Sequence, residues 1–263
     1  MWLNELKPIH KRDLVLKHPY VNAPGTLGFA PDPHQMPFLS RLGAFTTNPV
    51  SRKSRQPAGN RVCLPFKGGV LLHTGHPNPG IQRVISRNRH RWADAPLPII
   101  VHLLAEYPET LYEMVRKLEG LENVQAVEIG IPPGCDSSLL EAFMEAASGE
   151  LPLILSLSPQ EITLLETVKN SQARAVHLAP PRGTLPNPKG ELVSGRLYGP
   201  ATFPILLQAL KTVLHAQLDV IASGGVTTQK QAEILLNTGA VAVSLGIVLW
   251  NVHLGALFPE KPG

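Results

Sequence analysis

Two glycine-containing turns near the end of the chain have the composition of a phosphate-binding site. The first is Ser223-Gly224-Gly225-Val226-Thr227-Thr228, which follows an apolar run and opens a helical stretch. The second is Ser244-Leu245-Gly246-Ile247, which follows the last apolar run. Glycines let backbone N–H groups approach an anion, and a helix N-terminus adds donors and a favourable dipole. The turns could simply connect elements, but their paired placement favours a phosphate site.

The apolar runs that position these turns alternate with amphipathic stretches from about Pro98 onward. The runs are short, rich in β-branched residues and apolar on both faces, which is typical of parallel strands covered on both sides. Strand–helix alternation of this kind predicts right-handed βαβ units. Strands are expected at 99–103, 126–131, 153–157, 175–178, 220–223 and 240–245, and helices at 109–118, 137–147, 160–170, 204–214 and 228–237.

Two earlier strands, at 20–23 and 43–47, bring the expected strands to eight. The sequence therefore predicts an α/β protein, one (β/α)8 TIM barrel over residues 1–263, in which the two glycine turns follow strands seven and eight. Residues 48–97 hold too little helical pattern for one unit, and we interpret them as an inserted loop region with a short strand at 70–73. An open doubly wound sheet is the alternative.

Composition excludes several classes of protein. Of the 263 residues, 43% are hydrophobic and 17% are charged, which indicates a large core rather than disorder. The net charge is +4, without a motif or aromatic stripe for nucleic acid, so small anionic ligands suit the basic surface better. No run has membrane-spanning length, the first residues lack a signal-peptide pattern, and the two cysteines lack metal-ligand spacing. We expect a cytoplasmic protein without metal, nucleic-acid partner or membrane partner, and assembly into a homo-oligomer stays open.

Several segments, taken in order, match the motifs of one known family. They are Asn22-Ala23-Pro24-Gly25-Thr26, the strand segment 43–48, the turn 75–80, the segment 195–201 and the two closing glycine turns. Over about 21–249 the chain resembles the flavin-dependent dihydroorotate dehydrogenases. This resemblance implies a TIM barrel with FMN across the strand ends and its phosphate between the last two loops. The implied FMN contacts are Ala23, Gly199, Ser223, Gly224, Gly225, Gly246 and Ile247, although Ile247 replaces a small hydroxyl residue.

The family residues that bind the flavin ring and the substrate are largely replaced. The lysines after the second strand and on the fifth strand correspond to Asn48 and Ser156. The fourth-strand asparagine and the catalytic base fall at Gly130 and Pro133. A lysine beside the flavin stabilises its anionic reduced form, and the asparagines hold the pyrimidine, so the resemblance implies a substrate other than dihydroorotate. The asparagine of the hairpin loop falls at Leu72, and the sixth-strand Asn-Thr pair falls near Ala179-Pro180.

Other residues near these positions could supply the chemistry. Cys135 lies two residues beyond the family base, where a thiol is either inert or reactive. His76 belongs to the loop that covers the substrate in the family and could transfer a proton. Arg182 could bind an anion or be a solvated loop charge, and Glu128, within a strand, is best interpreted as part of a structural ion pair. The predicted catalytic residues are Cys135 and His76, and the predicted substrate contacts are His73, Asn78 and Arg182.

Two functions remain open. The first is an FMN-dependent oxidoreductase with a substrate other than dihydroorotate. The two glycine turns, which match those of the family, favour it. The second is a flavin-free barrel that binds another phosphorylated ligand or serves as a non-catalytic subunit, which the missing lysines and asparagines favour. Because a fold alone does not fix function, the replaced residues carry weight. We favour the first function because backbone groups supply most of the FMN phosphate contacts in such barrels.

Overall fold

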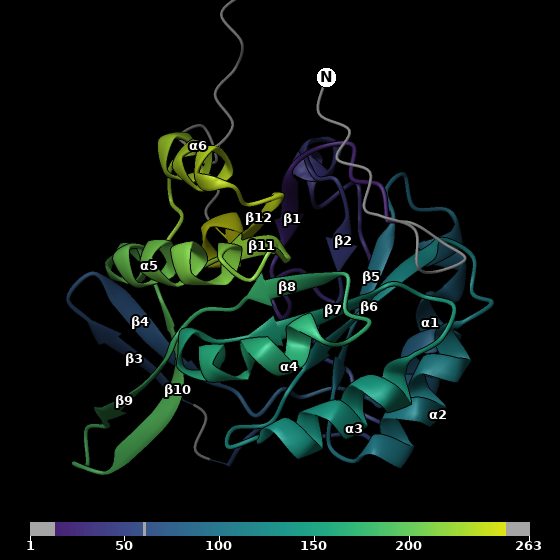
Figure 1. The fold of residues 1–263 in the computed structure, drawn as a ribbon, viewed down its shortest axis with the longest axis horizontal. Helices are drawn as coiled ribbons and strands as arrows, with labels where there is room; N and C mark the ends of the chain where they lie inside the picture. Colours follow the sequence, from purple (N-terminus) through teal and green to yellow (C-terminus); the bar gives the residue numbers. More distant parts are fainter. Residues whose placement is uncertain (1–13, 60–61, 251–263) are drawn as a thin grey trace, which may run out of the picture.

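Eight parallel strands form the main sheet in the computed structural model, which describes residues 14–59 and 62–250. Their order is β1 (Tyr20–Asn22), β12 (Ala242–Leu245), β11 (Asp219–Ser223), β8 (Ala175–Leu178), β7 (Leu153–Leu157), β6 (Val124–Gly130), β5 (Ile99–Leu104) and β2 (Phe45–Thr46). A parallel bridge between Val21 and Ala44 joins the two edge strands. The predicted (β/α)8 barrel is confirmed (Figure 1). The N-terminal residues considered for a signal peptide lie outside the described residues.

The barrel closes through a buried amide side chain. Asn22 donates from Nδ2 to the Thr46 carbonyl oxygen over 2.6 Å and accepts from the Thr46 backbone N–H over 2.9 Å. The Gly43 N–H also donates to the Tyr20 carbonyl oxygen over 2.7 Å. These hydrogen bonds join the short strands β1 and β2, which share only one isolated bridge among the described residues. The closure fixes Ala23 at the carboxyl end of β1.

Helices connect the strands and cover the outside of the barrel (Figure 1). They are α1 (Ile81–Ala93), α2 (Pro108–Leu118), α3 (Ser137–Ala147), α4 (Leu165–Lys169), α5 (Phe203–Leu214) and α6 (Gln229–Thr238). The helix expected at 160–170 starts as a 3-10 helix, Pro159–Leu164, before α4. Three further 3-10 helices are Pro37–Arg41, Pro200–Thr202 and Ile247–Trp250. Within the described residues, no helix is long and apolar enough to cross a membrane.

Helix α1 lies in the region that the sequence predicts to be an inserted loop. Its buried side chains are Ile81, Val84, Asn88 and Trp92, which recur at helical spacing. Asn88 interrupts this stripe, and its Nδ2 donates to the Val84 carbonyl oxygen over 2.8 Å. The remaining positions are mostly polar, so the apolar signal of this helix is weak. The loop interpretation of this segment is wrong, because a narrow stripe anchored by Trp92 is enough once it packs on the barrel.

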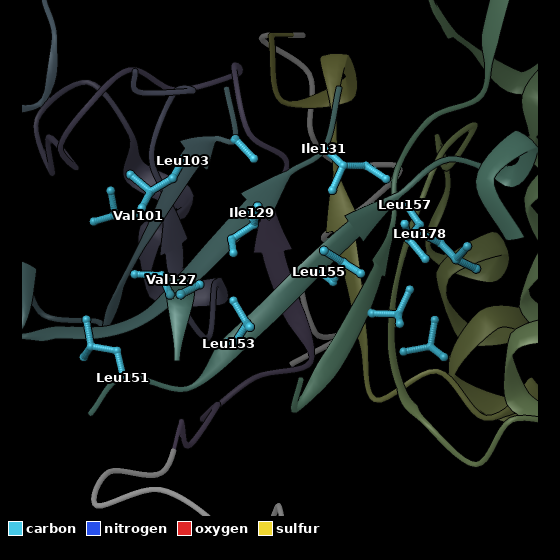
Figure 2. Packing of buried hydrophobic residues seen from close by; sticks show 14 of the residues in the cluster. Val101, Leu103, Val127, Ile129, Ile131, Leu151, Leu153, Leu155, Leu157 and Leu178 are labelled. Atoms are coloured by element: carbon cyan, nitrogen blue, oxygen red, sulfur yellow. The ribbon is translucent and has the colours of Figure 1, made fainter. Parts of the chain in front are cut away.

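The core has an outer and an inner layer, because side chains alternate between the two faces of each strand. Outward-facing residues such as Val101, Ile129 and Leu155 lie side by side on neighbouring strands and belong to the larger apolar cluster (Figure 2). The inner layer contains Val21, Ala44, Ile100, Ala126, Ile154, Ala175, Ile221 and Ala242. Two positions further along six of these strands, the inner residues are polar and buried: His102, Glu128, Ser156, His177, Ser223 and Ser244. The barrel interior is therefore apolar at one end and polar towards the carboxyl ends of the strands.

A second, antiparallel sheet lies at one side of the barrel (Figure 1). It contains β3 (Val62–Phe66), β4 (Gly69–His73), β10 (Leu192–Tyr198) and β9 (Arg182–Pro186), in the order β3-β4-β10-β9. Strand β4 contains the expected strand at 70–73, whereas β9 and β10 replace an expected loop. The turn between them is held by Asn187 Oδ1, which accepts from the backbone N–H groups of Lys189 and Glu191. This sheet brings residues 182–198 to the barrel mouth.

Candidate functional site

A cavity of about 250 Å³ lies between the loops that follow β11 and β12. Its lining includes the hydroxyl residues Ser223 and Ser244, whose Oγ atoms are buried and have no hydrogen-bond partner among the described residues. A buried polar group without a partner costs about 1–3 kcal/mol. An anion with acceptor oxygens, such as a phosphate, would satisfy both hydroxyls. The predicted cofactor residues Gly199, Ser223, Gly224, Gly225, Gly246 and Ile247 all line this cavity, which we call the phosphate cavity.

The glycines of the phosphate cavity have different structural roles. Gly225 has a φ of +69°, and a Cβ there would lie 2.4 Å from the backbone nitrogen of Phe203. This glycine is therefore required by the close packing of the loop against the start of α5. At Gly246 a Cβ would meet only the Tyr198 ring, at 3.7 Å, in ordinary contact. Gly246 consequently offers the cleaner position at which to fill the cavity without disturbing the backbone.

The N-terminus of α6 is capped by its own side chains. Gln231 Oε1 accepts from the backbone N–H groups of Thr227 over 2.8 Å and Thr228 over 3.2 Å. The Thr228 Oγ1 in turn accepts from the Gln231 backbone N–H over 3.3 Å. The amides of Thr227, Thr228 and Gln231 are thus already bonded, which reduces the number of free donors at this helix. The glycine loops and the serine hydroxyls are the other groups that an anion in the phosphate cavity would meet.

A second cavity of about 270 Å³, which we call the mouth cavity, lies at the carboxyl ends of the barrel strands. Tyr198 and Pro180 line both this cavity and the phosphate cavity, so the two adjoin. Its lining contains Ala23, one of the predicted cofactor contacts, and His76, one of the predicted catalytic residues. Other lining residues are His102, Gly130, Pro133, Ser156, His177, Arg55, Arg182 and Arg196.

A buried carboxylate between two histidines forms part of the mouth cavity. Glu128 is 2% exposed, and its Oε1 lies 2.7 Å from His177 Nδ1 and 3.0 Å from His102 Nδ1. Burial alone would raise the pKa of Glu128, but the two imidazoles outweigh it and hold that pKa well below its usual value. The ion-pair partner expected for Glu128 is confirmed, and it consists of two histidines that the motif analysis missed.

The two imidazoles occupy the region from which family side chains are missing. A Cβ at Gly130 would lie 2.6 Å from His102 Nε2, so the glycine leaves the space that this ring fills. His177 pairs in register with Ser156 on the adjacent strand β7. Its Nε2 atom is buried and has no hydrogen-bond partner in the part of the chain that the structure describes. This end of the barrel therefore contains two buried imidazoles beside Gly130 and Ser156.

Positive charge surrounds the mouth cavity. Arg55 is paired with Glu106, and Arg182 with Glu161 over 3.2 Å. Arg196 donates from Nη1 to the Pro180 carbonyl oxygen over 2.7 Å, and it forms no ion pair within residues 14–59 and 62–250. Burial and the neighbouring Arg182 lower the pKa of Arg196 to about 10. An uncompensated guanidinium beside a cavity is suited to binding an anion.

His76 lies at the rim of this basic mouth. Its pKa is lowered to about 4, first by desolvation and then by the electrostatic influence of His102, Arg196, Arg55 and Arg182. The ring is therefore neutral near pH 7 while the surrounding guanidinium groups stay charged. A groove of about 700 Å³ continues outward over the second sheet, and the predicted substrate contacts His73 and Arg182 line it together with His76.

Sequence comparison shows which known proteins this chain resembles. No family model matches the chain. Catalytic subunits of dihydroorotate dehydrogenase B (NAD(+)) from Maridesulfovibrio salexigens and Trichlorobacter lovleyi are each 28% identical to it, over 89% of this chain and 84% of the relative. Dihydroorotate dehydrogenase A (fumarate) from Lactobacillus helveticus is 27% identical over 92% of this chain and 87% of its own. Over most of its length the chain is therefore similar to dihydroorotate dehydrogenases.

A solved structure agrees in fold. The crystal structure of DHODH from Eimeria tenella in complex with ferulenol matches with a TM-score of 0.70 at 16% identity, over 91% of this chain and 80% of that chain. In the present chain, Gly130, Pro133 and Ser156 line the mouth cavity. They stand where the family resemblance puts an asparagine, the catalytic base and a lysine. These three departures therefore concern residues that line the cavity.

Three residues singled out from the sequence lie outside the cavities. Cys135 lines none of the three cavities described, and desolvation with nearby Asp136 and Glu161 raises the pKa of its thiol to about 11. A thiol of this kind is a poor nucleophile or base at neutral pH. Asn78 is buried within its own turn, where Oδ1 accepts from the Gly80 N–H over 2.9 Å. Asn48 accepts from the Gly28 N–H over 3.0 Å, so its side chain holds a loop.

Proposed function

We propose that this protein is an FMN-dependent oxidoreductase that acts on a small anionic substrate other than dihydroorotate. Similarity to dihydroorotate dehydrogenases supports redox chemistry, since the relatives are named as dehydrogenases. The observation that carries the proposal is the phosphate cavity, with two buried hydroxyls lacking partners among the described residues, beside a separate cavity at the barrel mouth. This arrangement suits a ligand with a phosphate at one end and a ring at the other.

The residues present fit FMN at the phosphate end. The loops of Gly224 and Gly246, with the hydroxyls of Ser223 and Ser244, would hold the phosphate. Ala23 and Ser156 line the cavity that would receive the ring. When bound, FMN would supply the two-electron acceptor, and the chain would supply binding, orientation and charge. The lysine charge expected beside the ring in the family is missing at Ser156, so weaker binding is expected than in relatives.

The substrate is inferred from what lines the mouth cavity. Pro133 replaces the family base and has no group that can take a proton, and Gly130 has no amide to hold a pyrimidine. Arg196, by contrast, offers a guanidinium without a carboxylate partner in the described residues. These features favour an anion and disfavour dihydroorotate oxidation by the family route. Arg182 and His73, which line the outer groove, remain proposed substrate contacts.

The flavin is tested by titrating the purified protein with FMN and following the quenching of its fluorescence. Saturable binding is expected, and Gly246→Val should weaken it at least about tenfold because the new side chain enters the phosphate cavity. Gly59→Val is the matched control, since a Cβ there meets nothing within 4 Å and the residue lines none of the three cavities. Equal FMN affinity of the two valine variants would contradict the assignment of the phosphate cavity.

The substrate assignment is tested by dye-coupled oxidation of dihydroorotate with FMN added in excess. We expect no turnover above background, because the base is missing from the loop after β6. Turnover at about 1 per second or faster, which is ordinary for an enzyme, would show that the protein is a dihydroorotate dehydrogenase after all.

One observation favours a second function, a flavin-free barrel for a smaller phosphorylated ligand. Tyr198 lines all three cavities, so its ring stands between the phosphate cavity and the mouth. A ligand confined to the phosphate cavity would not have to pass this ring. If FMN does not bind but inorganic phosphate raises the melting temperature of the protein, and Gly246→Val removes that effect, this second function is the better description.

A further inference from the structure

The polar inner layer of the barrel contains an arrangement that the proposed function has not yet used. His102 on β5, Glu128 on β6 and His177 on β8 all lie on the inner face and are at least nine-tenths buried. Both rings meet the same carboxylate oxygen through Nδ1, at 3.0 Å and 2.7 Å. Because an ionised carboxylate only accepts hydrogen bonds, each Nδ1 must carry a proton. The Nε2 atom of each ring is then left as the ligand-facing nitrogen.

A purely structural cluster would satisfy its polar atoms within the protein. Here the buried Nε2 atom of His177 has no partner among the described residues, although His177 lines the mouth cavity. Burying such an acceptor unpaired costs free energy that a well-packed apolar residue would avoid. His102 also lines the cavity, with its Nε2 in the space that Gly130 leaves open. Both nitrogens are therefore placed for a ligand in the mouth cavity.

We propose that His177 and His102 form an acid–base site for a small carboxylate ligand that Arg196 holds in the mouth cavity. Glu128 is the positioning residue, because its carboxylate fixes both rings through Nδ1. The inference rests on the proposed function for the identity of the mouth as the substrate site. It does not require flavin to be bound, since all of its groups belong to this chain.

Proton transfer at this site balances without a further reactant. The Nε2 lone pair of His177 takes a proton from the ligand, the bond from that hydrogen to the ligand breaks, and its electron pair stays on the ligand. The imidazolium that results is stabilised by Glu128 at 2.7 Å. Arg196 stabilises the negative charge that develops on the ligand. His102 provides a second hydrogen bond to Glu128, which keeps the carboxylate ionised when His177 changes its protonation state.

The other titratable and charged groups at the cavity do not compete for this role. Arg55 and Arg182 are engaged with Glu106 and Glu161, and His76 lies at the exposed rim of the loop after β4. Burial raises the pKa of the Tyr198 phenol, so it stays protonated at neutral pH. Among the groups lining the described mouth cavity, His102 and His177 are thus the buried ones that combine a free nitrogen with a carboxylate behind the ring.

Bromoacetate is the probe that tests the site, because it joins a carboxylate for Arg196 to a carbon that an unprotonated imidazole attacks. The Nε2 lone pair forms the N–C bond, the C–Br bond breaks and bromide leaves. The reaction is run on ligand-free protein carrying Cys63→Ser and Cys135→Ser, so that thiols do not consume the reagent. Peptide mapping should find His177 or His102 carboxymethylated at Nε2 at least about tenfold faster than exposed His215, a gain expected from one charge-assisted contact.

Matched controls separate ligand binding from simple reactivity. Bromoacetamide, which has no charge, should lose this advantage, and Arg196→Gln should remove the preference for bromoacetate over bromoacetamide. Glu128→Gln should slow the labelling, because the rings lose the carboxylate that positions them. Labelling of His215 with both buried rings untouched, or equal rates with the two reagents, would overturn the proposal.

Nitrogen-15 NMR of protein labelled in its histidine side chains provides an independent reading. In its neutral form each ring should carry its proton on Nδ1 and leave Nε2 bare. A proton found on Nε2 of His177 with Nδ1 bare would overturn the acid–base assignment. Failure of FMN to bind would remove the flavin from the proposed function, yet it would leave the labelling and the NMR result unchanged, so the two failures are distinguishable.

Discussion

The phosphate cavity and the mouth cavity lie side by side but have diverged from the family to different extents. The phosphate cavity keeps the glycine turns after β11 and β12, together with Ser223 and Ser244. The mouth cavity has Gly130, Pro133 and Ser156 at the positions of an asparagine, a base and a lysine. Phosphate binding through loop backbone and short hydroxyls depends little on other side chains. Recognition of a particular ring and substrate depends on several side chains together, so these change as a set.

The mouth has not simply lost its polar groups. The space left at Gly130 contains the His102 ring, and His177 lies next to Ser156 in the sheet register. Both rings share Glu128, and Arg196 adds a charge from the second sheet. The mouth cavity therefore contains a buried carboxylate with two partners, at positions other than those that the family resemblance marks as replaced.

The largest expected effect is on the free energy of unfolding, and it comes from removing the Glu128 carboxylate from the mouth cavity. Glu128→Ala leaves two buried imidazoles without their carboxylate and should lower the free energy of unfolding by about 3–5 kcal/mol. Urea denaturation measures this change, with Glu141→Ala on the exposed face of α3 as the control. If both variants lose the same stability, Glu128 does not hold the inner layer together.

A lysine placed at each of the two replaced positions should sharpen the comparison. Ser156 lines the mouth cavity, so Ser156→Lys should tighten FMN by about 1.5–3 kcal/mol and raise its reduction potential. Asn48→Lys is the matched control, because Asn48 is bonded to the Gly28 loop and lines none of the three described cavities. Fluorescence titration gives the affinities and dye equilibration the potentials. Identical effects of the two lysines would mean that the ring does not lie over β7.

The serine hydroxyls of the phosphate cavity should show effects of opposite sign with and without ligand. Ser223→Ala and Ser244→Ala each remove a donor, so FMN binding should weaken by about 0.5–1.5 kcal/mol per hydroxyl. Without ligand, the same changes remove a buried hydroxyl that lacks a partner in the described residues. The free energy of unfolding of each variant should therefore equal that of the natural protein or exceed it by about 1 kcal/mol. Thermal unfolding with and without FMN measures both. A loss of stability in the ligand-free variants would show that the hydroxyls are already satisfied.

The smallest effect concerns pH at the rim of the mouth. The pKa of His76 is about 4 in the folded protein, below its ordinary value of 6.5, so the unfolded chain binds more protons between these values. The contribution of His76 to stability is full above pH 6.5 and is lost as the pH falls towards 4. Although neighbouring groups partly desolvate the ring, the residue is exposed at the rim, and solvent screening keeps the effect small. Urea denaturation at pH 7.5 and pH 5 should give a smaller pH difference for His76→Gln than for the natural protein.

The fold and the phosphate cavity could be predicted because their signals are local. Each strand from β5 to β12 in the barrel is a short apolar run, and α3 coincides with its expected range, opened by Asp136, whose side chain accepts from the Leu139 N–H. The hairpin β9–β10 was missed because its pairing partner, β4, is more than a hundred residues away in sequence. Helix α1 was missed because its apolar stripe is narrow and interrupted by Asn88.

The mouth could have been found in part from strand periodicity. His102 follows inner-layer Ile100 by two residues, and His177 follows Ala175 in the same way, as Glu128 follows Ala126. Period-two alternation therefore places all three side chains inside the barrel. The sequence does not show which strands are neighbours, because that depends on the order of strands in the sheet. It also does not show which side chains of a loop line a cavity, and this is why Cys135 and Asn78 were predicted at the site. Cys135 lines none of the three cavities, and Asn78 holds its own turn.

The most direct test compares the affinities of the purified protein for FMN and for riboflavin, which lacks the phosphate. If the phosphate cavity is the part of the flavin site that is kept, the phosphate should supply most of the binding free energy of FMN. FMN should therefore bind at least about a hundredfold more tightly than riboflavin, the equivalent of two charge-assisted contacts. Equal affinity for the two flavins would contradict it, because binding would then be carried by the mouth cavity and not by the loops after β11 and β12.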